Sequence, residues 1–249
     1  MQFTYRSYAS MIENLLNRGY QIRNYKNWDD TAKTVILRHD VDYNLKKAVA
    51  LSEVEKKVCN GGGIYFVLVS TDFYNIHSKE SRKAINTILE NGGSIGLHFD
   101  ETQYSIFSEE ELKKYVCKEA EILSDIVGTR IEAVSMHRPS ANMLDADIRF
   151  ANIINSYSHI YIKEMKYLSD SRRHWRENVD EIIEQGSFTR LHILTHPFWY
   201  SQGVESNLKQ TLKEAILNAS LEYYDNLNDN FRSLQEEIRR SEIERMIYQ

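Results

Sequence analysis

The stretch Thr34-Val35-Ile36-Leu37-Arg38-His39-Asp40-Val41-Asp42 decides the fold, because an apolar run passes directly into a cluster of charged side chains. Residues 34–37 are typical of a buried strand. Three more strand-like runs end in the same way: Leu97-His98-Phe99-Asp100, Met136-His137-Arg138-Pro139 and Leu194-Thr195-His196-Pro197. Parallel strands bring their last side chains to one rim of a sheet or barrel. The sequence therefore predicts an α/β chain whose strand ends share one polar site.

Helical and strand patterns alternate along most of the chain. The helical patterns cover residues 7–18, 45–58, 81–90, 108–127 and 178–184, and the strand patterns cover 34–37, 64–69, 94–97, 131–136 and 191–195. Such alternation is typical of parallel β/α architecture. Because 249 residues are enough for one α/β barrel, we expect a single domain over 1–249.

The C-terminal segment, from about residue 205 to 249, has a different composition. It is rich in Glu, Lys, Arg, Leu and Ile and contains no Pro or Gly, which predicts a mostly helical segment with a break near 226–230. The segment is either a terminal barrel helix or a helix that joins two copies or binds a partner. An apolar stripe favours the second alternative: Leu234, Ile238, Ile243 and Ile247.

The overall composition excludes several classes of protein. Hydrophobic residues make up 42% and charged residues 27% of the chain, values close to globular averages. The net charge of -5 gives no electrostatic reason to expect a nucleic acid partner. No apolar run has the length of a signal peptide core or of a membrane span. We therefore expect a cytoplasmic protein in which Cys59 and Cys117 are reduced thiols.

Asp40 and Asp42 lie two residues apart at a predicted strand end, so their side chains point the same way. Two carboxylates this close favour a bound divalent cation, with one carboxylate as metal ligand and the other as general base. The structural alternative is that Asp42 caps the following helix and that Arg38 forms a salt bridge.

His98, His137 and His196 each close a further predicted strand. A lone histidine at such a place is more often structural than functional, but three of them at neighbouring strand ends indicate a metal hydrolase. The aromatic run at 198–200 beside His196 suggests a surface on which sugars stack, although core packing is the ordinary use of such rings.

In order and spacing, these motifs resemble the polysaccharide deacetylase superfamily of the NodB-homology type, in its divergent branch with an Arg-His-Asp-Val-Asp opening. The resemblance is carried by residues 35–42, 95–98, 137–139, 167–171 with Trp175, and 193–197. It implies an irregular (β/α) barrel with fewer than eight barrel strands, followed here by the long helical C-terminal segment.

The resemblance also implies a role for each motif residue. Asp40 would be the catalytic base, Asp42 and His98 metal ligands, and His196 the general acid. The implied cofactor is a divalent metal, most often zinc in this family, which would polarise the acyl carbonyl and activate water. Arg138 would orient Asp40 and keep it ionised. Three further residues would contact the substrate: Asp170, Trp199 and Tyr200.

The sequence departs from the family pattern at the third metal ligand. The second family motif has two histidines four residues apart, and Thr102 stands where the second should be. His137 is the candidate replacement, and Asp100, Glu101 or a water are the alternatives. If His137 instead takes the place of the family's arginine, it would orient Asp40.

We therefore expect a metal-dependent carbohydrate N-deacetylase, a hydrolase that removes an N-acetyl or similar acyl group from a saccharide or its nucleotide- or lipid-linked precursor. The alternative from another class is a catalytically silent saccharide-binding or assembly protein on the same barrel. A hydrolase of some other amide is a third possibility, because the same groups would serve any accessible acyl amide. The expected partners are a carbohydrate substrate and, through the C-terminal helices, a second copy of the chain.

Overall fold

The structure is a computed structural model that describes residues 1–29, 31–140 and 146–248. The chain divides into two compact units, Met1–Gly203 and Val204–Gln249. The boundary lies at the start of the helical C-terminal segment expected from the sequence. That the two units make one domain stays a prediction.

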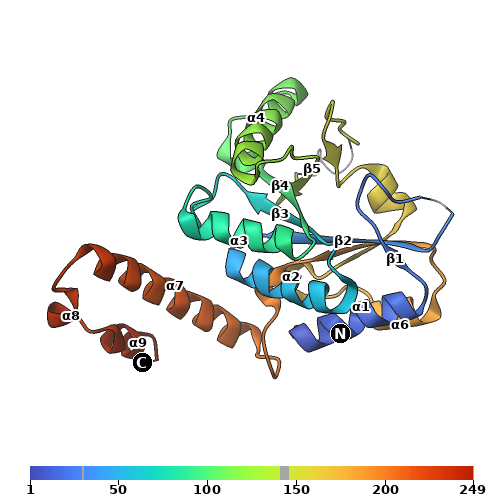
Figure 1. Cartoon of the computed structure of the whole chain (residues 1–249). Helices are drawn as coiled ribbons and strands as arrows, with labels where there is room; N and C mark the ends of the chain where they lie inside the picture. The colour runs from blue at the N-terminus through green and yellow to red at the C-terminus, as the bar shows by residue number, and fades with distance from the viewer. Residues whose placement is uncertain (30, 141–145, 249) are drawn as a thin grey trace. The chain divides into compact units, whose positions relative to one another are not determined.

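The first unit is built on a parallel sheet with helices around it (Figure 1). Its strands pair in the order β6-β5-β4-β3-β2-β8-β7, and β1 also pairs with β2. The strands are β1 Gln21–Ile22, β2 Thr34–Val41, β3 Ile64–Leu68, β4 Ser94–Asp100, β5 Ala133–His137, β6 Ile154–Asn155, β7 Lys166–Ser169 and β8 Arg190–Thr195. The sheet curls into an open half-barrel, which confirms the predicted irregular (β/α) barrel. In the described part of the chain it contains eight strands, not fewer than eight, because the short strand β1 pairs with β2 beside the main path of seven.

The helices of this unit are α1 Tyr5–Asn17, α2 Leu45–Cys59, α3 Lys79–Glu90, α4 Glu109–Val127 and α6 Val179–Gln185, with short turns η1 Glu101–Gln103, η2 Ile160–Glu164, η3 Ser171–Arg173 and η4 Pro197–Trp199. Helices α1, α2 and α3 lie side by side on one face of the sheet (Figure 1). Asn44, and not Asp42, caps α2 by accepting bonds from the backbone N–H groups of Lys46 and Lys47. The Asp42 carboxylate is therefore not used as the cap.

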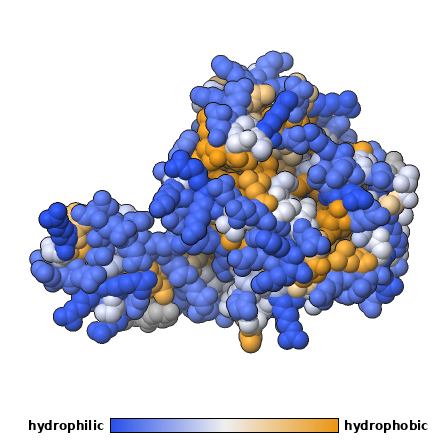
Figure 2. Space-filling model, in the orientation of Figure 1, coloured by the Kyte–Doolittle hydropathy of each residue, from blue (hydrophilic) through white to orange (hydrophobic). Residues whose placement is uncertain are grey.

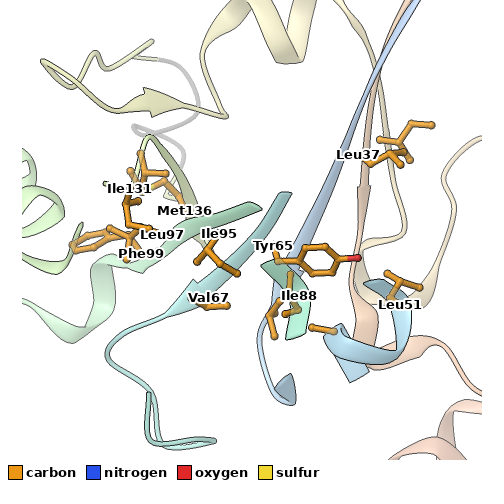
Figure 3. Close-up of a cluster of buried hydrophobic side chains, with 14 of the residues drawn as sticks. Leu37, Leu51, Tyr65, Val67, Ile88, Ile95, Leu97, Phe99, Ile131 and Met136 are labelled. Carbon is orange, nitrogen blue, oxygen red and sulfur yellow. The ribbon is translucent and has the colours of Figure 1, made fainter. Parts of the chain in front are cut away.

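Strand β2 is buried along its whole length, and its alternate residues enter two different environments. Val35, Leu37 and Val41 pack in the core between the sheet and the helices. Figure 3 shows this core, in which side chains of the sheet meet those of α2 and α3: Leu37, Tyr65, Val67, Leu51 and Ile88.

The other residues of β2 point into the barrel. Ile36 packs there in a second apolar cluster with Ile64, Phe66 and Ala133. This inner space is narrow at Gly96, where a Cβ atom would lie 2.5 Å from the Phe66 ring. Arg38, Asp40 and Asp42 follow Ile36 on the same side, so three ionisable groups line the inside of the barrel.

The second unit contains α7 Leu208–Asn230, α8 Leu234–Glu237 and α9 Arg240–Tyr248. Helix α7 ends at Asn230, within the range where the sequence predicts a break. The Tyr224 hydroxyl donates a 2.7 Å bond to the Ile238 backbone oxygen, and Arg240 pairs with Asp225 at 3.1 Å. Joining of two copies through this segment stays a prediction, and the side chain of Ile247, part of the expected stripe, lies outside the described residues.

The surface in the orientation of Figure 1 is mainly hydrophilic, with apolar patches set among polar side chains (Figure 2). Among the residues described, no helix combines the length and the apolarity needed to cross a bilayer.

Candidate functional site

Three potential metal ligands converge at the rim formed by the carboxyl ends of the strands. Asp42 follows β2, His98 lies in β4 and His137 ends β5. The Nε2 atom of His98 is 3.1 Å from Asp42 Oδ1 and 3.1 Å from His137 Nδ1. The third side of the triangle, from His137 Nδ1 to Asp42 Oδ1, is 3.3 Å. The chain therefore brings one oxygen and two nitrogens to a common point.

This triangle fits a cation. His98 Nδ1 lies 3.3 Å from the Ser135 backbone oxygen, which assigns the ring proton to Nδ1 and leaves a lone pair on Nε2. Only His137 can then bring a proton to the three facing atoms. In a tetrahedral zinc site with bonds of about 2.0–2.1 Å, the ligand atoms are about 3.3 Å apart, close to the separations here.

The Asp42 carboxylate is held in its ionised form. Burial opposes ionisation, but the hydrogen bond from His137 and the neighbouring imidazoles of His98 and His196 keep its pKa well below the usual range. An ionised carboxylate beside two imidazoles is a donor set that zinc binds readily.

Asp40 lies beside the triangle but is bound to a different partner. Arg38 donates from Nε to Asp40 Oδ1 at 2.9 Å and from Nη2 to Oδ2 at 2.8 Å, a bidentate pair. The Ser135 hydroxyl donates to the same carboxylate at 3.2 Å. Burial tends to raise the pKa of Asp40, but the charge and hydrogen bonds of Arg38 act together with the nearby His98 and His196 and lower that pKa to about 2. Asp40 Oδ2 is 3.9 Å from His98 Nε2, so the carboxylate faces the metal-ligand triangle.

The arginine on Asp40 is therefore Arg38, where the resemblance implied Arg138. Arg38 is completely buried, whereas Arg138 is exposed and its side chain hydrogen-bonds to Tyr43. The signal was in the sequence. Arg38 precedes Asp40 by two residues on a strand, so both side chains point into the barrel.

His196 and Asp170 form a pair near the site, in which Asp170 is buried and His196 is partly buried. His196 Nδ1 is 2.6 Å from Asp170 Oδ1, and the His196 backbone N–H donates to the same carboxylate at 3.0 Å. Asp170 is completely buried and also accepts a 3.1 Å bond from the Tyr200 hydroxyl. Burial tends to lower the pKa of His196, but the Asp170 carboxylate outweighs it and raises that pKa to about 9. At neutral pH His196 is therefore a protonated imidazole with Nε2 free to donate.

The other residues considered for the third metal position are engaged elsewhere. The Asp100 carboxylate accepts from the backbone N–H and hydroxyl of Thr102, at 3.0 and 2.7 Å. Glu101 Oε1 accepts a 2.7 Å bond from the Ser140 backbone N–H. Of the candidates on the chain, His137 is the one that meets Asp42 and His98.

The aromatic run after His196 is placed differently from the expectation. Tyr200 is completely buried against Phe3 and Tyr8 and bonds to Asp170, so it cannot stack on a sugar. Asp170 likewise supports His196 and has no surface in a cleft. Trp199 is half-buried against the apolar core. Phe198 is also half-buried, and its ring centroid lies 4.8 Å from that of Tyr43.

Comparisons with known proteins give similarity only among solved structures. No protein-family model matches the sequence, and no curated protein matches it either. A CE4 family pseudoenzyme from Bacillus anthracis aligns with 78% of this chain at 13% identity and a TM-score of 0.45. A peptidoglycan deacetylase from Bacillus subtilis aligns with 82% at 15% identity and 0.44, and the chitin deacetylase of the fungus Colletotrichum lindemuthianum with 81% at 12% and 0.44.

The chain spans 63% of the length of the Bacillus anthracis structure, 100% of the Bacillus subtilis one and 87% of the fungal one. With identities this low and TM-scores below 0.5, the likeness does not by itself assign an activity or a metal to this chain.

Proposed function

We propose that this protein is a metal-dependent hydrolase that removes an N-acetyl or similar acyl group from a sugar. One observation carries the proposal: a triad of metal-ligand atoms from Asp42, His98 and His137 has near it a separately held carboxylate, Asp40, and a histidine, His196, whose charge acts on both Asp40 and Asp42. Amide hydrolysis needs a base for the water and an acid for the leaving nitrogen, and this rim offers one of each.

Asp42, His98 and His137 would hold the metal. A divalent metal such as zinc supplies Lewis-acid activation of water and of an acyl carbonyl. Asp40 accepts the proton that the attacking water loses, because it is ionised and faces the triad. His196 donates its Nε2 proton to the amine nitrogen as the C–N bond breaks. Acetate and a free amino sugar are the products, and the two proton transfers balance.

The hydrogen-bond partners of Asp40 and His196 determine the different roles of these two residues. Arg38 and Ser135 fix the direction in which Asp40 accepts a proton, and they hold it away from metal coordination. Asp170 and Tyr200 fix the ring of His196 and keep it charged. Each reacting group is thus oriented by a buried neighbour that does not itself contact the substrate.

A second candidate is a saccharide-binding protein without catalysis, and one observation favours it. Both oxygens of Asp40 are engaged by Arg38 and Ser135, and with its pKa at about 2 this carboxylate is a weak base. The two candidates differ in turnover, not in fold.

The first test is metal content per chain of protein purified without chelator. Wild type and a His77→Ala control should hold close to one zinc or other divalent ion, because His77 is exposed and is not a member of the triad. His98→Ala and His137→Ala should retain less than about a tenth of it. Absence of metal in wild type, even after it is added back, would rule out the hydrolase and favour the binding protein.

The cytoplasmic location, the zinc identity and the nucleotide- or lipid-linked form of the substrate remain predictions from the sequence.

A further inference from the structure

Three aromatic rings from separate segments meet at the rim of the barrel. The Tyr43 ring lies between the other two, 4.7 Å from the centroid of Phe73 and 4.8 Å from that of Phe198. Both contacts are edge-to-face, so the rings are packed and not merely close. Phe73 is 60% exposed, and Tyr43 and Phe198 are half-buried. We call Tyr43, Phe73 and Phe198 the aromatic rim.

Chain connectivity places the aromatic rim next to the site. Tyr43 directly follows the metal-ligand candidate Asp42, and Phe198 is separated from His196 only by Pro197. Two residues span at most about 7 Å of backbone, so the backbones of Tyr43 and Phe198 lie near those of Asp42 and His196. The rim therefore joins the metal-ligand side of the site to the acid side.

Phe73 belongs to the segment between β3 and α3 and is held there by its neighbour. The Tyr74 hydroxyl donates a 2.9 Å bond to the Val41 backbone oxygen and accepts a 2.8 Å bond from the Leu68 backbone N–H. These bonds fasten the segment to the carboxyl ends of β2 and β3. The backbone that carries Phe73 is therefore held in place by hydrogen bonds, and the Phe73 side chain is exposed at the rim from this fixed position.

Arg138 adds a polar group to the same rim. It directly follows His137, the third ligand candidate, and its side chain hydrogen-bonds to Tyr43. Its backbone is in the left-handed region at φ 51°, which costs a non-glycine residue energy and is often found at functional sites. A guanidinium beside exposed rings can donate to hydroxyl groups while the rings contact C–H groups.

We propose that the aromatic rim binds the sugar ring that carries the acyl group, with Arg138 donating to its hydroxyls. The inference rests on the proposed function and specifies its substrate class. A pyranose has an apolar C–H face and a polar edge, and it matches a surface of aromatic rings with one donor group. A small acyl amide without a ring would leave the rim uncovered. The rim thus selects N-acylated sugars over other amides that the same acid–base pair could cleave.

The test measures binding and turnover separately. Binding of the methyl glycosides of N-acetylglucosamine, N-acetylgalactosamine and N-acetylmannosamine is followed by calorimetry with the metal-loaded full chain. Phe73→Ala and Phe198→Ala should each weaken the tightest of these complexes about three- to tenfold. Phe188→Ala is the matched control: this phenylalanine is 40% exposed but precedes β8, at the opposite end of the strands, and should leave binding unchanged.

Binding of none of the three glycosides to wild type would overturn the proposal, as would equal affinities in the rim variants and the control. Release of 4-nitrophenol from 4-nitrophenyl acetate by wild type tests the hydrolase independently, because this small ester carries no sugar. Ring-dependent binding without ester cleavage would support the rim and reject the hydrolase. Ester cleavage together with sugar binding that does not depend on the rings would support the hydrolase and reject the aromatic rim.

Discussion

The two faces of strand β2 carry two buried ionic clusters: an outer cluster on the helix side and an inner cluster inside the barrel. They differ in whether their polar atoms are already paired. On the helix side, His39 Nε2 is 2.7 Å from Glu55 Oε1 and His39 Nδ1 is 2.6 Å from Thr195 Oγ1. The Tyr8 hydroxyl donates to Glu55 at 2.6 Å, and the Gly63 N–H donates to its other oxygen at 3.2 Å. In this outer cluster, formed by Tyr8, His39, Glu55 and Thr195, each polar side chain faces a charged or polar partner within the cluster.

The outer cluster also leaves no room for a ligand. A Cβ atom at Gly63 would lie 2.4 Å from Glu55 Oε2 and 2.6 Å from His39 Nε2, so only glycine permits this approach. Burial tends to raise the pKa of Glu55, but the His39 charge and the hydrogen bonds lower it overall. The carboxylate is thus ionised and fully used in holding α1, α2 and β3 to β2.

The inner cluster has the same kinds of residue but remains open. Asp40 is neutralised by Arg38, whereas Asp42 faces two imidazole nitrogens, of which His98 Nε2 carries a lone pair and only His137 Nδ1 can donate a proton. Strand alternation decides which cluster each residue joins, since His39 lies between Arg38 and Asp40. The comparison teaches that burial and charge alone do not mark a site. The inner cluster is distinguished by having more hydrogen-bond acceptor atoms than donated protons to fill them.

The largest effect should come from Asp40→Asn. If the inner cluster is catalytic, kcat should fall about 10²- to 10⁴-fold because the general base is lost, while the metal content stays near that of wild type. The rate of acetate release measures kcat, and metal analysis of the same preparation measures the metal content. Equal loss of metal in Asp40→Asn and Asp42→Ala would show instead that both carboxylates are ligands.

A smaller effect is expected from Asp170→Asn, read from the pH profile of kcat/KM. His196 donates only when protonated, so activity should persist below its pKa and fall as the pH rises through about 9. Without the Asp170 charge, the alkaline limb should move down toward the ordinary histidine value of about 6.5. An alkaline limb unchanged in Asp170→Asn would remove His196 as the acid.

The smallest effect on turnover should come from Glu55→Gln in the outer cluster. The isosteric change leaves a buried hydrogen-bond network unbalanced, so the free energy of unfolding should drop by about 1–3 kcal/mol. Because the outer cluster lies on the other face of β2, kcat/KM of the folded protein should equal that of wild type. Urea unfolding measures the free energy of unfolding, and steady-state kinetics measure kcat/KM. A tenfold loss of kcat/KM at unchanged stability would show that the outer cluster also takes part in catalysis.

Much of this arrangement could be predicted from the sequence, because alternation on strands is a local property. The pattern at 34–42 was sufficient to place Asp40 and Asp42 on one face and His39 on the other. The family pattern pointed to Arg138 as the partner of Asp40, whereas the salt bridge of Arg38, weighed as the structural alternative, is the one that Asp40 forms. The Asp170–His196 pair joins two strands, and such register is set by packing that no single segment encodes. For the same reason the sequence could not show which ring of the run at 198–200 packs against Tyr43.

The position of β2 between β3 and β8 has a consequence for how the chain acquires its site during synthesis. Thr34 pairs with Arg190 and His39 with Thr195, so one edge of β2 stays unpaired until nearly the whole first unit has left the ribosome. The triad of Asp42, His98 and His137 can assemble from the earlier strands, whereas His196 arrives with the last one. Pairing between such distant segments is slow and exposes an apolar strand edge meanwhile. A nascent chain stopped before β8 would hold the metal-ligand residues without the acid, and its open β2 edge would make it prone to aggregate.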